Sequence, residues 1–98
     1  MTFTIETGWP GVQAELTTDS TASSYGIPVL RIEADGESGD YGPADALPAG
    51  PWASGDDLSP CCGAELVVTW AKQPGRTPEE VQAARRYLRQ WPDGPQID

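Results

Sequence analysis

The sequence contains no histidine, only two cysteines, a single lysine and no long apolar run among its 98 residues. Without histidine, the chain cannot form Ser-His or Cys-His nucleophilic pairs or use imidazole as a metal ligand. It also lacks the run of about 20 apolar residues that a membrane-spanning helix requires. The N-terminal stretch MTFTIETGWPG has neither the basic start nor the apolar stretch of a secretory signal. We therefore expect one cytoplasmic domain over residues 1–98 that is not an enzyme.

Positive charge is scarce and unevenly placed. The formal net charge is −9, from 15 acidic and 6 basic side chains. Residues 1–71 contain 11 acids and one base, whereas residues 72–98 contain 5 bases and 4 acids. Binding to phosphates requires Lys or Arg to displace counterions, so direct contact with nucleic acid or an anionic membrane is disfavoured. The charge favours a protein partner with a basic surface.

Alternating apolar side chains and β-branched residues predict four strands. These strands are expected over residues 2–7, 12–19, 27–34 and 64–72. Asp35-Gly36 is typical of a two-residue hairpin turn. Residues 36–60 are rich in Gly, Pro, Ala, Ser and Asp, which predicts a long irregular loop.

The segment TPEEVQAARRYLRQWPDG predicts a helix over residues 78–91. Thr77 and Glu80 form a capping-box pattern, and Pro78 suits the first helical position. Apolar side chains recur at helical spacing and define a buried stripe. The stripe consists of Val81, Ala84, Leu88 and Trp91, widened by Tyr87. Together, these elements predict an α+β fold, a small antiparallel sheet of three to four strands with one C-terminal helix packed across it.

Three arginines of this helix, Arg85, Arg86 and Arg89, fall outside the apolar stripe and have no acid three or four residues before them. Two outcomes remain open for them. Against the acidic body they would form internal ion pairs, whereas exposed they would favour self-association by opposite charge. The sequence leaves the oligomeric state open.

The two cysteines are adjacent, in the stretch SPCCGAEL over residues 59–66. The segment Ser59-Pro60-Cys61-Cys62-Gly63 resembles the C-P-x-C-G knuckle of zinc-ribbon proteins, with Ser59 in place of the first ligand. Structural zinc requires four ligands, and the chain has no second knuckle. A disulfide between neighbouring residues would be strained, since their Cα atoms lie about 3.8 Å apart. We therefore predict a tight turn without metal or cofactor; a decayed ribbon-like or thiol module is the alternative.

The remaining candidate site is a surface for another protein. Tyr41 and Trp52 are the apolar anchors of the predicted loop, and they either attach it to the body or contact a partner. The partner-binding residues that we predict are Tyr41, Trp52, Asp35, Glu37, Asp40, Asp56 and Asp57. The acidic cluster around Glu37 does not fit the EF-hand calcium pattern.

These features predict a small acidic, non-enzymatic interaction protein. In size and acidity the chain resembles the small proteins with which phages occupy the nucleic-acid-binding surfaces of host or defence proteins, which implies an inhibitor. A structural accessory, such as a virion component, is a further alternative.

Overall fold

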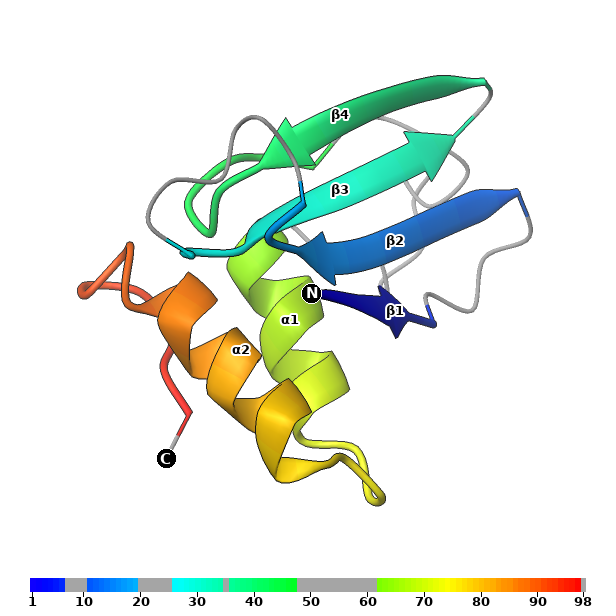
Figure 1. Ribbon diagram of the computed structural model, residues 1–98. Coiled ribbons are helices and arrows are strands. Elements are labelled where there is room, and N and C mark those ends of the chain that lie inside the picture. Colours follow the sequence, from blue (N-terminus) through cyan, green and yellow to red (C-terminus); the bar gives the residue numbers. More distant parts are fainter. Residues whose placement is uncertain (7–10, 20–25, 35, 48–61, 98) are drawn as a thin grey trace.

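The computed structural model describes residues 1–6, 11–19, 26–34, 36–47 and 62–97. In this part of the chain, a four-stranded antiparallel sheet lies against two helices (Figure 1). The strands are β1 (Thr2–Ile5), β2 (Val12–Thr17), β3 (Val29–Ala34) and β4 (Glu37–Tyr41). The helices are α1 (Gly63–Ala71) and α2 (Pro78–Leu88). The predicted α+β class and antiparallel sheet are confirmed, and the C-terminal helix is joined by a second one.

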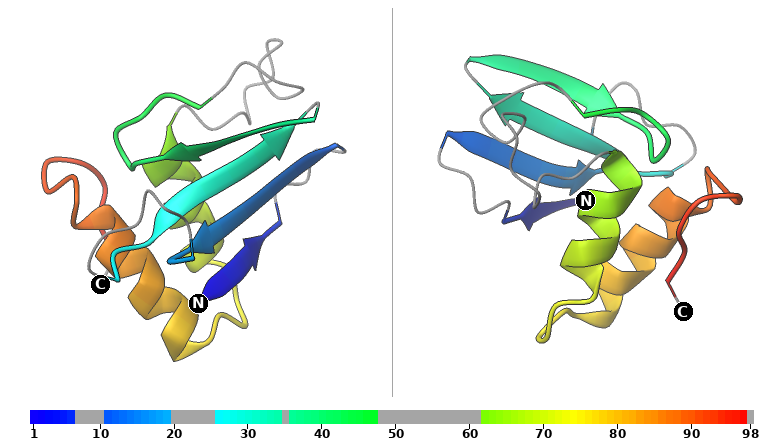
Figure 2. Two further views of the ribbon diagram at one scale, coloured as in Figure 1. Left: turned by 45° about the horizontal axis from the view of Figure 1, so that its top comes forward. Right: turned by 180° about the vertical axis from the view of Figure 1, so that it is seen from behind.

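The sheet is a simple meander in the order β1-β2-β3-β4, and both helices cover the same face of it (Figure 2). Alternation along β1 and β2 directs apolar side chains toward the helices, as predicted. The register pairs Ile5 with Ala14 and Ala14 with Ile32, all of which are buried. Leu16 and Leu30 pair in the same way and are fully buried.

Strand β4 lies in the segment that the sequence analysis assigned to an irregular loop, so that prediction is wrong for residues 37–41. The predicted hairpin turn explains the strand: Ala34 pairs with Glu37, and Gly36 adopts a φ of +79°. A position with φ > 0 suits glycine, because it has no Cβ. The strand sequence, ESGDY, contains no apolar alternation, so two-residue periodicity does not indicate this strand. The Tyr41 ring lies across Gly39 and supplies the packing surface that glycine lacks.

Residues 64–72 were predicted to form a strand, and this prediction is also wrong, because Gly63–Ala71 is helix α1. The β-branched run Val67-Val68-Thr69 and the apparent alternation through Trp70 favoured the strand. The buried positions are instead Gly63, Ala64, Leu66, Val67 and Trp70, which follow helical spacing.

Helix α1 also lacks the usual start signal. Cys62 occupies the N-cap position and makes no side-chain capping bond. The first helical N–H groups find acceptors in a turn distant in sequence: Gly63 N donates to Asp45 O at 3.2 Å, and Ala64 N donates to Pro43 O at 3.0 Å. Tertiary contacts therefore replace the local cap.

Helix α2 begins as predicted and ends three residues earlier, with Arg89 as its C-cap. The capping box is present: Glu80 N donates to Thr77 Oγ1 at 3.2 Å, and Thr77 N donates to Glu80 Oε1 at 2.9 Å. The buried stripe is Ala83, Ala84, Tyr87 and Leu88, while Val81 and Trp91 are half-buried.

The two helices and the β3–β4 end of the sheet meet at Gly63. Tyr87 is fully buried, and its hydroxyl donates to the backbone oxygen of Tyr41 at 3.0 Å. A Cβ at Gly63 would contact the Tyr87 hydroxyl and would lie only 2.6 Å from the Gly42 carbonyl oxygen. Glycine is therefore required here for close approach, since no φ above zero is involved.

We expect Gly63→Ala to destabilise the protein by about 1–3 kcal/mol, the usual cost of overpacking. The sign of this change in unfolding free energy is informative, because replacing glycine by alanine at an unstrained position normally stabilises a protein by about 0.4–1 kcal/mol. Urea unfolding of the wild type and of Gly63→Ala measures the difference, with the exposed Thr69→Ala in the same helix as control. A neutral or stabilising Gly63→Ala would contradict the packing described here.

Candidate interaction surface

The face of the sheet opposite the helices carries a row of polar residues across all four strands. The register places Thr4, Glu15, Arg31 and Asp40 side by side. Arg31 is the one base of this row, and its Nε donates to Asp40 Oδ1 at 3.2 Å. Cross-strand neighbours of opposite charge stabilise a sheet modestly, so Arg31 holds the middle of the row together.

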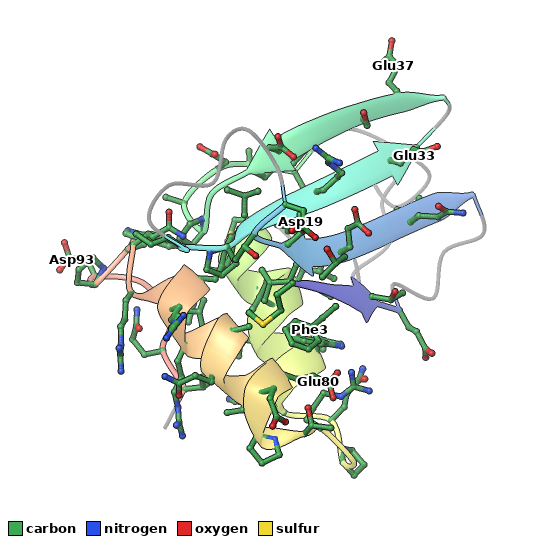
Figure 3. All side chains as sticks on the ribbon, viewed as in Figure 1. Phe3, Asp19, Glu33, Glu37, Glu80 and Asp93 are labelled. Carbon is green, nitrogen blue, oxygen red and sulfur yellow. The ribbon has the colours of Figure 1, made fainter. Side chains whose placement is uncertain are left out.

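The acids concentrate on the β3–β4 hairpin, which carries Glu33, Glu37 and Asp40; we refer to these three residues as the acidic hairpin. Glu33 and Glu37 are exposed, whereas the side chain of Asp40 is 24% exposed and pairs with Arg31. Glu33 pairs with Ser38 on the face opposite the helices, whereas Glu37 pairs with Ala34 beside the turn. Figure 3 shows Glu33 and Glu37 at the same end of the hairpin, far from Asp93 beyond α2. The hairpin therefore projects negative charge from one end of the sheet.

The structure describes three of the seven predicted partner-binding residues. Glu37 and Asp40 lie together on β4, as parts of the acidic hairpin. Tyr41 is half-buried and packs against the core, and its backbone oxygen accepts from Tyr87. Trp52, Asp35, Asp56 and Asp57 lie outside the described residues.

Glu15 and Glu33 were not predicted as site residues, although the sequence carries a signal for them. Both alternate with inward-facing apolar residues of the predicted strands, so strand periodicity alone places them on the polar face. Their proximity to Asp40 depends on the register between strands, which the sequence analysis did not derive.

Asp19 shows that some acids of the sheet already have partners within the fold. Its carboxylate accepts from Thr2 Oγ1 at 2.8 Å and pairs with the N-terminal ammonium at 3.1 Å. The hydrogen bond from Thr2 and then the ammonium group hold the pKa of Asp19 below its ordinary value. Asp19 therefore fastens the start of β1 to the end of β2.

Cys62 is half-buried at the start of α1, and its backbone forms an isolated antiparallel β-bridge with that of Ala46. Cys61 lies outside the described residues. The apolar segment after Gly63, which was predicted to be a strand, is helix α1. Among the described residues, no group of three or more His, Cys, Asp or Glu side chains is arranged to hold a metal ion. In the same part of the chain, no helix combines the length and apolarity needed to cross a membrane.

Searches against protein-family models, curated proteins and solved structures found no match to this chain. The fold class is α+β, and the candidate site is defined by the geometry of the acidic hairpin alone.

Proposed function

We propose that this chain is a small non-enzymatic interaction protein whose acidic hairpin binds a basic surface of another protein. The observation that carries the proposal is that one hairpin exposes Glu33 and Glu37, while its single base, Arg31, is paired with Asp40. A fixed array of like charges on a hydrogen-bonded hairpin loses little conformational entropy on binding. It also steers a partner of opposite charge during encounter.

The acidic hairpin fits a protein that normally binds nucleic acid, because such a surface presents Lys and Arg to phosphates. Occupying that surface would make the chain an inhibitor of the phage type, acting inside the cell. The carboxylates of the hairpin would then take the place of phosphate groups.

The test compares two doubly substituted proteins with the same net charge. Glu33→Gln/Glu37→Gln removes two acids of the hairpin, and Glu79→Gln/Asp93→Asn removes two exposed acids elsewhere. Each change moves the net charge from −9 to −7, which is −9 + 2. Each protein is immobilised and used to capture proteins from a cell lysate between about 50 mM and about 500 mM salt. Over this range the Debye length, the distance over which charges interact, falls steeply.

We expect the wild type and the control to capture the same basic protein, with capture falling as salt rises. The hairpin variant should bind it about 5–30-fold more weakly, since each exposed charge contributes up to about 1 kcal/mol. Added nucleic acid should displace the captured protein. Equal binding by both variants, or binding that ignores salt, would rule out the acidic hairpin as the contact surface.

A further inference from the structure

Helix α2 carries three arginines whose partners are missing within the described fold. Arg31 and Arg76 pair with Asp40 and Glu80 at 3.2 and 2.9 Å. Among the described acids, none forms an ion pair with Arg85, Arg86 or Arg89. The helix dipole favours cations near the helix C-terminus, but it gives no reason for apolar side chains to be exposed beside them.

Two exposed apolar side chains flank these arginines. Met1 and Ile27 are 50% and 37% exposed, and they are the exposed large hydrophobic residues of the described chain. Each lines a shallow hollow that also includes Arg86. The hollow at Ile27 measures about 430 Å³ and is completed by Gly26, Arg89 and Gln90. We call this hollow, with its two arginines, the arginine groove.

The arginine groove has a fixed wall. Gln90 Nε2 donates to Pro28 O at 3.2 Å and to Tyr87 O at 3.1 Å, which ties the end of α2 to the start of β3. Ile27 and Arg89 therefore approach the hollow from two elements that are held together. An apolar patch rimmed by charge is typical of a protein-binding surface.

We infer that the arginine groove binds the acidic hairpin of a second copy of this chain. The two surfaces are complementary in charge, because the groove is basic and the hairpin is acidic. In the contact, Arg86 and Arg89 of one copy face Glu33 and Glu37 of the other. Within one copy the two surfaces are separate: the groove lies beside Gly26 and Ile27, before β3 begins, whereas Glu33 and Glu37 lie where β3 ends and β4 begins. One copy therefore presents both surfaces at the same time, and a head-to-tail contact between copies builds rings or open chains.

The net charge of −9 opposes this association over long distances. At physiological salt the Debye length is about 8 Å, so local pairs dominate the contact itself. Self-association is therefore strongest at intermediate salt and is lost at high salt. The inference does not depend on the proposed function, although a basic partner would compete with the second copy for the acidic hairpin.

The test uses charge reversal on each surface. Arg86→Glu/Arg89→Glu makes both surfaces acidic and moves the net charge to −13, which is −9 − 4. Glu33→Arg/Glu37→Arg makes both surfaces basic and moves it to −5, which is −9 + 4. All four side chains are exposed, so both variants should fold, and far-ultraviolet circular dichroism checks this.

Sedimentation velocity over a concentration series at about 0.15 M salt measures the association. We expect the wild type to form larger species with rising concentration, and each variant alone to associate at least about tenfold more weakly, the effect of roughly 1.4 kcal/mol. An equimolar mixture, whose mean net charge is again −9, should recover wild-type association, because each reversed surface meets its complement.

A wild type that stays monomeric, variants that associate like the wild type, or a mixture that stays monomeric would overturn the inference. A poly-glutamate peptide is titrated in parallel. Binding of this peptide to the groove without association of copies would assign the groove to another acidic protein and would also overturn it. The groove variant retains its acidic hairpin, so its lysate capture tests the proposed function separately.

Discussion

Replacing Trp70 by alanine is expected to destabilise the protein by about 3–5 kcal/mol. Domains of this kind have total stabilities of about 5–15 kcal/mol, so the variant should lie close to unfolding. The side chain is 1% exposed and is the largest buried one in the described core. Its ring lies 6.4 Å from that of Phe3 on β1, and the guanidinium carbon of Arg76 lies 5.1 Å from the ring centroid.

Trp70 links three parts of the fold by packing alone. Among the described residues its buried indole nitrogen has no hydrogen-bond partner, so the substitution removes packing contacts there and no hydrogen bond. The loss is the transfer free energy of the ring, the cavity that remains, and the cation–π contact with Arg76. Arg76 keeps its ion pair with Glu80, so the end of α1 should loosen before the start of α2 does.

Trp91→Ala provides a matched control, because it makes the same chemical change at a half-buried position. We expect it to cost about 1–2 kcal/mol, in proportion to the smaller area buried. Urea unfolding of both variants gives the comparison. Similar losses for the two tryptophans would contradict the central position of Trp70.

Raising the pH above 10 is expected to destabilise the protein through Tyr87. Burial, followed by the nearby charges of Asp45 and Cys62, raises the pKa of the Tyr87 phenol above its ordinary value near 10. Below pH 10 the phenol is neutral in the folded and unfolded chains, and its contribution is fully present. Above that pH only the unfolded chain ionises it, so unfolding releases a proton. The free energy of unfolding should then fall by up to about 1.4 kcal/mol per pH unit.

Tyr87→Phe isolates this contribution from the other groups that titrate at high pH. At neutral pH it should cost about 1–2 kcal/mol, because the Tyr41 carbonyl loses its donor at 3.0 Å. Above pH 10 the difference between the two proteins should shrink and then change sign near pH 11, since only the wild type carries the phenol. Stability curves that stay parallel from pH 8 to pH 12 would show that Tyr87 ionises freely in the fold.

Local sequence patterns were sufficient to predict a helix or strand wherever that element contained its own capping or periodicity signal. The capping box at Thr77 predicted the start of α2, two-residue periodicity predicted β1 and β2, and β-branched residues predicted β3. The close pairing of Ala34 with Glu37 agrees with the hairpin predicted from Asp35-Gly36. The strand that follows was missed, because ESGDY has no apolar face of its own and forms by hydrogen bonding to β3.

Helix α1 shows why the rest could not be predicted. Its apolar residues fit both the two-residue period of a strand and the period of a helix, and its β-branched residues favoured the strand. The hydrogen bonds that start the helix come from Pro43 and Asp45, about 20 residues earlier, and no short window of sequence contains both ends of such a bond. The close approach at Gly63 depends in the same way on Tyr87 and Gly42.

The candidate surfaces likewise depend partly on local sequence and partly on tertiary contacts. The sequence by itself determined the excess of acids, the absence of histidine chemistry and the position of the arginines on α2. Only the tertiary structure decided that Glu33, Glu37 and Asp40 share one hairpin, that Arg31 is held by Asp40, and that Ile27 lies beside Arg86 and Arg89. Charge is a property of each residue, whereas the grouping of charges depends on strand register and helix packing, which follow from contacts between residues distant in the chain.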